Sequence, residues 1–434
     1  MARDRLPTIV RVSGQTRPQR DGVPCDEQVI GATSEECGAN GRVVPGPYPP
    51  GPHPMGPGPV GPDPVGPNPT GPWAARTPPR ILPAMRVGFD VTPLERRRGD
   101  EPRGLARVVE ELVGKLEERG RVEVVRLAPA DGEPLGRWRR RTLAAAPRRE
   151  GLAGLHSFTS GFPPFGPGKR VQTVHELPWR HGVRENAGWR HRAWAALGPL
   201  FADRVVCATE HVARDLRRRW LPGAGRVRVC PWGVGPPFEE EPPPGTVDEV
   251  VLGRYRLPED PLALCLAATR PKKNLAAVLQ GLAEVRRRGG PSLHIVITGA
   301  ETPQLRRDLG LASQLGLARW ITTQEEVEEA DLPALLRLAS VVPVLSHSEG
   351  FGLPVLEALA CGTPVVVPRG SAQAEVAGEH GIAVDPADPS SVADGLIEAV
   401  ERREELRYQL PERARELSWD RAAERVEALW EELA

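Results

Sequence analysis

Apolar residues downstream of position 85 alternate between short continuous runs and longer stretches with helical spacing. The run MRVGFDV at 85–91 is typical of a buried strand, and the stretch 104–120 repeats its apolar residues every three to four positions, as a helix does. Further strands are predicted at 170–176, 203–210 and 226–233. This alternation favours parallel sheets with crossover helices.

A second alternating series follows the acidic, proline-rich stretch FEEEPPPGT. Strand-then-helix pairs are predicted at 262–288, 292–314, 341–361 and 363–379. The stretch between the two series contains the residues that interrupt helices and strands, so it is predicted to be a linker. Two open α/β domains with a cleft between them are expected, and ligands of such sheets bind beyond the carboxyl ends of the strands.

The first 84 residues have a different pattern. From Gly46 a glycine-proline pair returns every five residues, whereas a collagen triple helix requires glycine at every third. Extended, disordered, polyproline-like chain is therefore expected. The predicted organisation is a tail at 1–84, a first domain at 85–237, a linker at 238–246, and a second domain at 247–434 that includes the C-terminal helices.

Length and cysteine usage narrow the class of protein. No apolar run of the 434 residues approaches the roughly 18 needed to cross a bilayer, and the N-terminal residues lack the apolar core of a secretory signal. A cytoplasmic protein is predicted. The six cysteines include no C-x-x-C pair, and Cys207, Cys230 and Cys265 lie in apolar runs, where a free thiol packs as a small hydrophobe. Neither a disulfide framework nor a zinc site is expected.

Charge is unevenly distributed although the net charge is zero. Residues 85–237 carry 29 basic and 17 acidic side chains, a net charge of +12, whereas residues 238–434 carry 20 and 33, a net charge of −13. A difference of this size indicates that the halves have different partners, or that two domains attract each other across a cleft.

Two carboxylates lie in an otherwise apolar and glycine-rich stretch, HSEGFGLPVLEALACGTPVVVP at 347–368. Glu349 belongs to a loop after a predicted strand, and Glu357 to the helix that follows; no basic residue lies near either in sequence. Gly350 and Gly352 allow a ligand close to the loop backbone, and free N–H groups at a helix N-terminus attract phosphate.

A buried, unpaired carboxylate is unfavourable, so Glu357 is expected to face a solvent-filled cleft or to bind strong donors such as sugar hydroxyls. Glu349, eight positions earlier, can point into the same cavity. The alternative is that both carboxylates are exposed and stabilise the dipole of the helix that begins between them.

The motif EGFGLPVLE, followed by ACGTPVVVP, resembles the nucleotide-sugar signature of glycosyltransferase family 4, the glycosyl transferases group 1. The similarity extends through RPKKNLAAVLQGLAEV, TVHELP and MRVGFDVTPL, and covers nearly everything from Met85 onward. It implies the GT-B fold, an α/β architecture with two Rossmann-like open parallel-sheet domains facing across a cleft. It also implies transfer of a hexose from a nucleoside diphosphate sugar with retained configuration.

The resemblance also assigns roles to individual residues. Glu357 would hold the ribose hydroxyls of the donor, and Glu349 would contact the transferred sugar. Arg270 and Lys273 would neutralise the diphosphate leaving group, because fixed cations stabilise the charge that develops there. His175 would face the sugar. Backbone amides would face the sugar and diphosphate, and the donor-side residues are Gly104, Gly350, Phe351, Gly352 and Leu353.

Simpler interpretations exist for the same residues. Lys272 and Lys273 would be ordinary solvated residues before a helix capped by Asn274, and a histidine at a strand end is more often a structural donor. The chain also departs from the family pattern. Ala106 replaces the second glycine of a Gly-x-Gly-Arg-Tyr loop, and Glu176 replaces an aspartate. These changes weaken any claim about the donor base.

The implied partners are the nucleotide-sugar donor and a glycan or lipid-linked acceptor, in assembly of cell-surface polysaccharide or glycolipid; no metal or other cofactor is expected. Arginines around Trp138, at 136–149, suit an anionic surface at the inner face of the membrane. The alternative is a solvated, arginine-rich helix. Nucleic acid is not an expected partner, because interleaved aromatics and reader motifs are lacking.

Other functions are compatible with the same fold, because a fold does not determine an activity. A sugar phosphorylase or a nucleotide-sugar epimerase would use a similar cleft. A catalytically weak scaffold protein, acting through its proline-rich tail, is an alternative from a different class.

Overall fold

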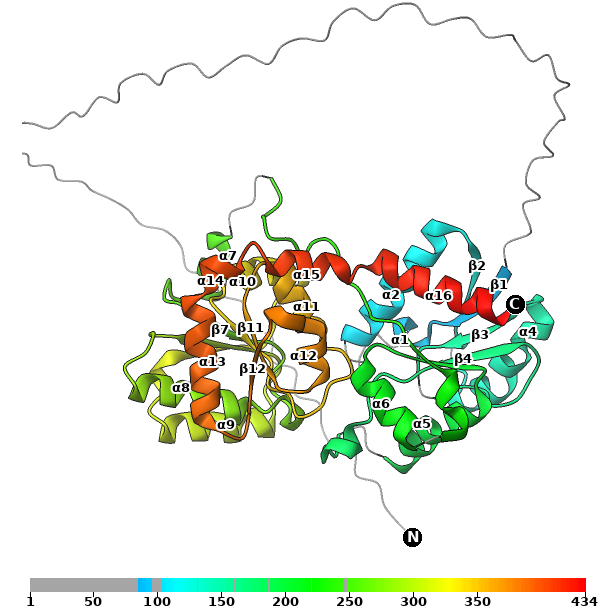
Figure 1. Cartoon of the computed structure of the whole chain (residues 1–434), viewed down its shortest axis with the longest axis horizontal. Helices are drawn as coiled ribbons and strands as arrows, with labels where there is room; N and C mark the ends of the chain where they lie inside the picture. Colours follow the sequence, from blue (N-terminus) through cyan, green and yellow to red (C-terminus); the bar gives the residue numbers. More distant parts are fainter. Residues whose placement is uncertain are drawn as a thin grey trace, which may run out of the picture. The chain divides into compact units, whose positions relative to one another are not determined.

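A computed structural model provides the three-dimensional structure of the chain (Figure 1). It describes residues 85–95, 103–130, 132–159, 161–185, 188–219, 221–244 and 248–434. The prediction of a disordered tail at 1–84 lies outside the described residues.

The first half of the described chain is built on a six-stranded parallel sheet with the strand order β2-β1-β3-β4-β5-β6. Its strands are β1 (Met85–Asp90), β2 (Val122–Leu127), β3 (Gly154–Ser157), β4 (Lys169–Thr173), β5 (Arg204–Cys207) and β6 (Val227–Val229). The predicted strands are present. β2 and β3 were not predicted from the sequence. β2 is largely half-exposed and β3 has only four residues, so neither forms a long apolar run.

Helices connect these strands, as the crossover geometry of a parallel sheet requires. They are α1 (Thr92–Glu95), α2 (Arg103–Arg119), α3 (Leu135–Arg137), η2 (Trp138–Leu143), α4 (Ala144–Glu150), η3 (Pro178–His181), α5 (Trp189–Phe201), α6 (Glu210–Arg219) and η4 (Leu221–Arg226). The predicted helix at 104–120 corresponds to α2, whose apolar side buries Val109, Leu112 and Leu116 completely.

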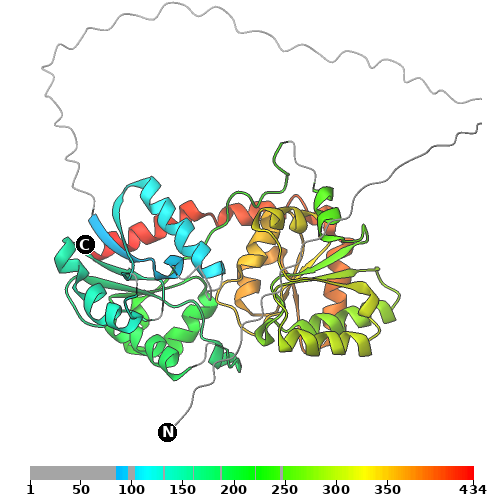
Figure 2. The same ribbon diagram turned by 180° about the vertical axis from the view of Figure 1, so that it is seen from behind.

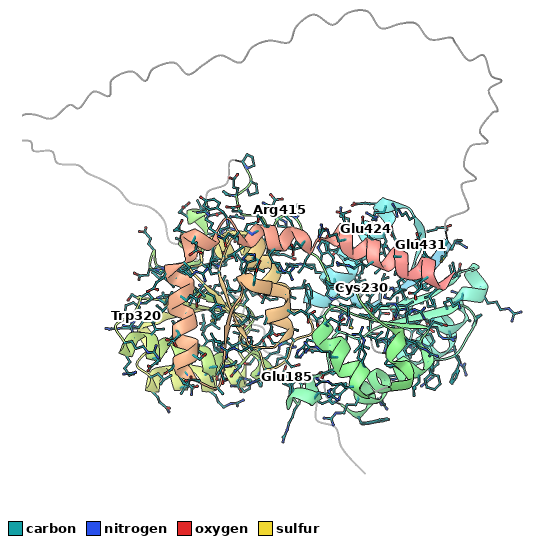
Figure 3. The ribbon with its side chains drawn as sticks, in the orientation of Figure 1. Glu185, Cys230, Trp320, Arg415, Glu424 and Glu431 are labelled. Atoms are coloured by element: carbon teal, nitrogen blue, oxygen red, sulfur yellow. The ribbon has the colours of Figure 1, made fainter. Side chains whose placement is uncertain are left out.

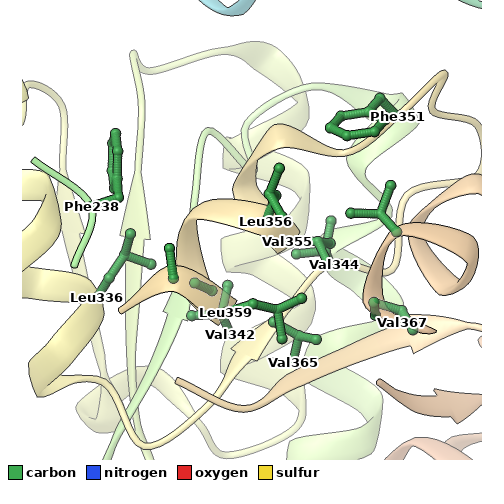
Figure 4. Close-up of a cluster of buried hydrophobic side chains, with 14 of the residues drawn as sticks. Phe238, Leu336, Val342, Val344, Phe351, Val355, Leu356, Leu359, Val365 and Val367 are labelled. Atoms are coloured by element: carbon green, nitrogen blue, oxygen red, sulfur yellow. The ribbon is translucent and has the colours of Figure 1, made fainter. Parts of the chain in front are cut away.

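The second half contains two three-stranded parallel sheets, ordered β7-β8-β9 and β10-β11-β12. A parallel bridge between Ala263 and Val341 joins them. Figure 2 shows the strands and helices of this half from behind. The strands are β7 (Leu262–Cys265), β8 (His294–Thr298), β9 (Ile321–Gln324), β10 (Val342–Pro343), β11 (Val365–Pro368) and β12 (Ile382–Val384). The core between β10, β11 and helix α11 (Leu353–Ala360) consists of tightly buried aliphatic side chains, among them Leu356 and Leu359 (Figure 4).

The remaining helices of this half follow its strands in the predicted order. They are α7 (Glu249–Tyr255), η5 (Pro271–Lys273), α8 (Leu275–Arg287), α9 (Pro303–Gln314), η6 (Ala318–Trp320), η7 (Glu329–Asp331), α10 (Leu332–Leu338), α12 (Ala372–Ala377), η8 (Gly378–His380), α13 (Pro389–Glu401), α14 (Arg403–Leu406), α15 (Leu410–Glu416) and α16 (Trp419–Leu433). Every second-half helix predicted from apolar spacing is present.

The C-terminal helix α16 packs against α2 of the first half, although the predicted domain boundaries place it with the second half. Its acidic side chains meet first-half arginines. Nε of Arg119 lies 3.1 Å from both carboxylate oxygens of the buried Glu427, and Arg204 and Arg228 both pair with Glu432. Figure 3 shows other glutamates of this helix, including Glu424. Part of the predicted attraction between oppositely charged halves is therefore carried by α16.

Two simpler expectations can be compared directly with the described residues. Cys207, Cys230 and Cys265 are free and buried, as their apolar surroundings predicted. No helix in the described part of the chain combines the length and apolar character that crossing a membrane requires.

Candidate functional site

The loop between β10 and α11 holds two glycines that the packing requires. A Cβ on Gly350 would lie 1.7 Å from the carbonyl oxygen of His175, so no other residue allows this approach of the two halves. Gly352 has φ = 98°, a conformation that favours glycine, immediately before α11 begins. The carbonyl oxygen of Gly350 also accepts a 2.9 Å hydrogen bond from the hydroxyl of Thr209. The loop is thus held directly against the first half.

The amide groups of this loop are available to an anion. Among the described residues, no backbone N–H from Gly350 to Leu353 donates a hydrogen bond to another group. The first N–H groups of α11 lack partners for the usual reason, because no preceding turn supplies their carbonyls. Free amides and the positive end of the helix dipole together suit a phosphate group.

Glu349 is largely buried, with 14% of its side chain exposed, between two lysines that the sequence places far from it. Nζ of Lys273 lies 2.8 Å from Oε1 of Glu349, and Nζ of Lys272 lies 3.6 Å from Oε2. Burial raises the pKa of this carboxyl, but the two ammonium groups outweigh burial and bring its pKa down to about 2. Glu349 is therefore ionised throughout the physiological pH range.

Lys272 also connects the halves. Its Nζ lies 3.2 Å from both carboxylate oxygens of Glu176, and its backbone N–H donates a 3.0 Å hydrogen bond to Glu185, labelled in Figure 3. Burial raises the pKa of Glu176, and the Lys272 charge opposes that effect. The interpretation of Lys272 and Lys273 as solvated residues is wrong, because Lys272 is 6% exposed. Asn274 does not cap α8 with its side chain either, since Nδ2 donates to the carbonyl of Leu345.

Glu357 receives its partner from the first half. It is 5% exposed, and Oε1 accepts a hydrogen bond from Nη1 of Arg107 on α2. Nη2 of the same guanidinium pairs with Glu329, and its Cζ lies 5.1 Å from the ring centroid of Phe238. Burial raises the pKa of Glu357 and Arg107 opposes the rise. Glu357 therefore has a basic partner within the protein, although none lies near it in sequence.

A cavity of ≈ 70 Å³ lies beside this ion pair. The side chains that line it include Arg107, Glu111, Phe238, Glu329, Leu353 and Glu357. Residues from both halves of the chain thus surround the second glutamate. The alternative that both glutamates are exposed carboxylates is excluded by their burial.

The other predicted residues occupy different surroundings. Nε2 of His175 lies 2.7 Å from the carbonyl oxygen of Phe158, and burial lowers the pKa of His175, which keeps the ring neutral. Gly104 lies opposite Leu353, since a Cβ there would be 3.7 Å from a methyl carbon of that leucine. Phe351 is 5% exposed and packs into the core, so only its backbone can contact a ligand (Figure 4).

Arg270 precedes the lysines at the start of η5. It is half-buried and forms no ion pair with another described residue. The structure therefore brings Lys273 together with Glu349, and Gly104 together with Leu353. The side chain of Arg270 forms no hydrogen bond or ion pair with any of these described residues.

Sequence reasoning missed Arg107 and underestimated Lys272. Arg107 lies in the GLARV stretch, at the position that matches the arginine of the Gly-x-Gly-Arg-Tyr pattern, but only the glycines of that pattern were weighed. An arginine next to the altered glycine was the available signal. The position of Lys272 next to Lys273 in sequence did not indicate that Lys272 is buried, because its burial results from packing against the first half.

Comparison with known proteins agrees with this architecture. Residues 254–417 match the family described as glycosyl transferases group 1. A D-inositol 3-phosphate glycosyltransferase of Xylanimonas cellulosilytica is 32% identical over 233 residues, which are 51% of this chain and 55% of that protein. The chain spans about half the length of such curated relatives.

Solved structures extend the comparison to the whole fold. Sucrose-phosphate synthase from Thermosynechococcus elongatus superposes with a TM-score of 0.63 at 19% identity, over 80% of this chain and 99% of that one. Anabaena HepE in complex with UDP and glucose superposes with a TM-score of 0.60 at 13% identity, over 80% and 100%. At these identities the similarity concerns the fold.

Two parallel-sheet halves, joined by the loop and lysine contacts described above, define a protein of the GT-B class. The second half, residues 254–417, matches the model of the glycosyl transferases group 1 family. The resemblance seen in the motif EGFGLPVLE is confirmed.

Proposed function

We propose that this chain transfers a hexose from a nucleoside diphosphate sugar to a glycan or lipid-linked acceptor, with retained configuration. The observation that carries the proposal is the set of groups around the start of α11. Free amides from Gly350 to Leu353 lie between two carboxylates, the largely buried Glu349 and the buried Glu357, and Lys273 contacts the first of them. The family match and the names of the relatives support the reaction class.

In this proposal the diphosphate binds at the loop amides and at the basic residues of η5. Lys273 would contact the phosphate oxygens while keeping Glu349 ionised. Arg270, which pairs with no other described residue, would add a second positive charge. Cations and amides already oriented in the free protein stabilise the developing charge without further reorganisation.

Glu357 would accept hydrogen bonds from the ribose hydroxyls. Among the described residues, its hydrogen bond falls on Oε1, which leaves Oε2 for a hydroxyl donor. Such donors suit a buried carboxylate, because hydrogen bonding replaces the lost hydration. Glu349 would hold the transferred sugar.

The transfer would break the bond between C1 of the sugar and the diphosphate oxygen. The acceptor hydroxyl would form the new bond on the same face, and its proton would pass to the departing phosphate. The part that the protein contributes is positioning and electrostatic stabilisation. The uncharged His175 would contribute a hydrogen bond to the sugar and no charge.

Donor binding is tested by thermal unfolding of the full chain with a panel of nucleoside diphosphates and their hexose derivatives. One nucleotide at 100 times its Kd is expected to stabilise the protein by about 2.7 kcal/mol. Glu357→Ala is expected to remove most of this effect. Glu379→Ala, at an exposed carboxylate of η8, is the matched control.

Unfolding that is unaffected by every nucleotide at millimolar concentration would contradict the proposal. Product analysis separates the related activities. Phosphate-dependent disaccharide cleavage would indicate a phosphorylase, and donor isomerisation without an acceptor would indicate an epimerase.

We also propose that the acceptor is presented at an anionic surface. The helical segment α3-η2-α4 exposes five arginines, Arg137, Arg140, Arg141, Arg148 and Arg149. Trp138 is 1% exposed and packs inward, so it does not serve as a membrane anchor. The attraction would therefore be electrostatic, with no insertion of this side chain.

Vesicle sedimentation at low salt measures this attraction. Each basic residue near an anionic surface contributes about 1 kcal/mol, so Arg140→Glu with Arg141→Glu should weaken partitioning onto phosphatidylserine vesicles by about 30-fold or more. Arg286→Glu with Arg287→Glu, on α8, is the control pair. Equal partitioning onto neutral and anionic vesicles would overturn this part of the proposal.

A further inference from the structure

Away from the two donor-side glutamates, α6 and η3 bring together three side chains with metal-ligating atoms. His181 ends η3, while His211 and Asp215 lie four residues apart on α6. That spacing puts both α6 side chains on one face of the helix. The candidate ligand atoms all lie within 4.8 Å of one another, and no other such group of three is found among the described residues.

The distances are close to those of a metal site. Nε2 of His181 lies 2.9 Å from Oδ2 of Asp215, and the rings of His181 and His211 have centroids 5.2 Å apart. In a tetrahedral site with bonds of about 2.0 Å, the ligand atoms lie about 3.3 Å apart. The side chain of His181 is 30% exposed, so an ion can reach it from solvent.

Outer hydrogen bonds orient the two α6 ligands. Nδ1 of His211 lies 3.1 Å from the carbonyl oxygen of Gly370, so with Nδ1–H as donor the lone pair is on Nε2. Nε of Arg180 lies 3.1 Å from Oδ1 of Asp215, which leaves Oδ2 towards His181. Metal-binding histidines typically donate their second N–H in this way.

We propose that His181, His211 and Asp215 bind one divalent transition metal ion of the zinc type, with the fourth position open to water. Two imidazoles and one carboxylate favour such an ion over Mg²⁺ and Ca²⁺, which prefer oxygen ligands. None of the three residues belongs to the donor-binding set, so the proposal is independent of the glycosyl transfer proposed above.

The ion would reinforce a contact between the halves. The backbone N–H groups of Glu210 and His211 donate to the carboxylate of Glu375 on α12, at 2.6 and 2.8 Å. His211 also reaches the carbonyl of Gly370, just before α12. An ion that immobilises the His211 ring would strengthen this contact between the halves. Because the ion would bind only to the folded protein, it would also raise the free energy of unfolding.

The test is a titration of the chelator-treated full chain with CoCl₂, followed by visible absorption, and with ZnCl₂, followed by calorimetry. We expect one ion per chain and the d–d bands of four-coordinate Co²⁺. His181→Ala and Asp215→Asn should each weaken binding by at least about 10- to 100-fold. His380→Ala, at another histidine beside a glutamate, should leave binding unchanged.

Thermal unfolding of each variant without metal verifies that it folds. Binding of equal strength in the wild type and both ligand variants would overturn the proposal. Thiolate charge-transfer bands would also overturn it, since they would place the ion on cysteines. Absence of binding below millimolar concentration has the same consequence.

Discussion

Replacing Lys273 with alanine is expected to lower kcat/KM for the donor by about 10²- to 10³-fold, the effect of removing one preorganised group that stabilises transition-state charge. Its Nζ lies 2.8 Å from Glu349, so the substitution removes both the cation that we propose for the diphosphate and the main partner of that carboxylate. Release of nucleoside diphosphate from the hexose donor selected in the thermal screen measures the effect.

Lys273→Arg is the matched control, because it retains the charge and is expected to recover part of the rate. A change in kcat/KM of less than about fivefold in Lys273→Ala would contradict the assigned role.

A separate measurement concerns acid stability. The pKa of Glu349 is about 2, so its ion pairs stabilise the fold fully above its unfolded pKa of 4.5 and lose this effect as the pH falls towards 2. Loss of Lys273 should move the acid transition to higher pH.

Replacing Arg107 with alanine is expected to lower the free energy of unfolding by about 3 kcal/mol at pH 7, because Glu357 would remain buried without its partner. The ion pair is well covered, with side-chain exposures of 18% and 7%. Urea unfolding at a series of pH values measures the loss.

The pH dependence has a definite sign. Burial already raises the pKa of Glu357, and loss of Arg107 would raise it further. Below pH 4.5 the carboxyl is protonated in both folded and unfolded chains, so the destabilisation should be smallest there and should grow as the pH rises through the folded pKa. Glu357→Gln in the Arg107→Ala background should restore most of the stability. A loss of less than 1 kcal/mol at every pH would disprove the importance of the pair.

Local pattern was sufficient for most of the fold. Apolar runs and helical spacing predicted the strand β4, and they predicted β1, β7 and β8 together with the helices α2, α8 and α9 that follow them. Burial of both faces of a parallel sheet leaves such continuous apolar strands. The local pattern did not reveal β2 and β3. It also did not show which half α16 packs against, because the apolar spacing of a helix is the same whichever surface the helix covers.

Sequence alone also identified the carboxylates and glycines that matter. Glu349, Glu357 and the two glycines between them lie within one short stretch of sequence. Their order along the chain is therefore enough to predict that they meet at the start of α11. From the sequence, glycine at position 350 was expected because it allows a ligand to approach the backbone closely. Its actual neighbour is the carbonyl oxygen of His175.

Tertiary structure alone decided how those carboxylates are neutralised. Arg107 lies 250 residues before Glu357, and Lys273 lies 76 residues before Glu349. Periodicity and local motifs carry no information about pairs at such separations, because the pairing depends on how the sheets and the two halves pack. The sequence by itself thus determined most of the secondary structure and the fold class, and it carried the resemblance to the glycosyl transferases group 1 family. The packing of distant segments determined the ionisation of the site.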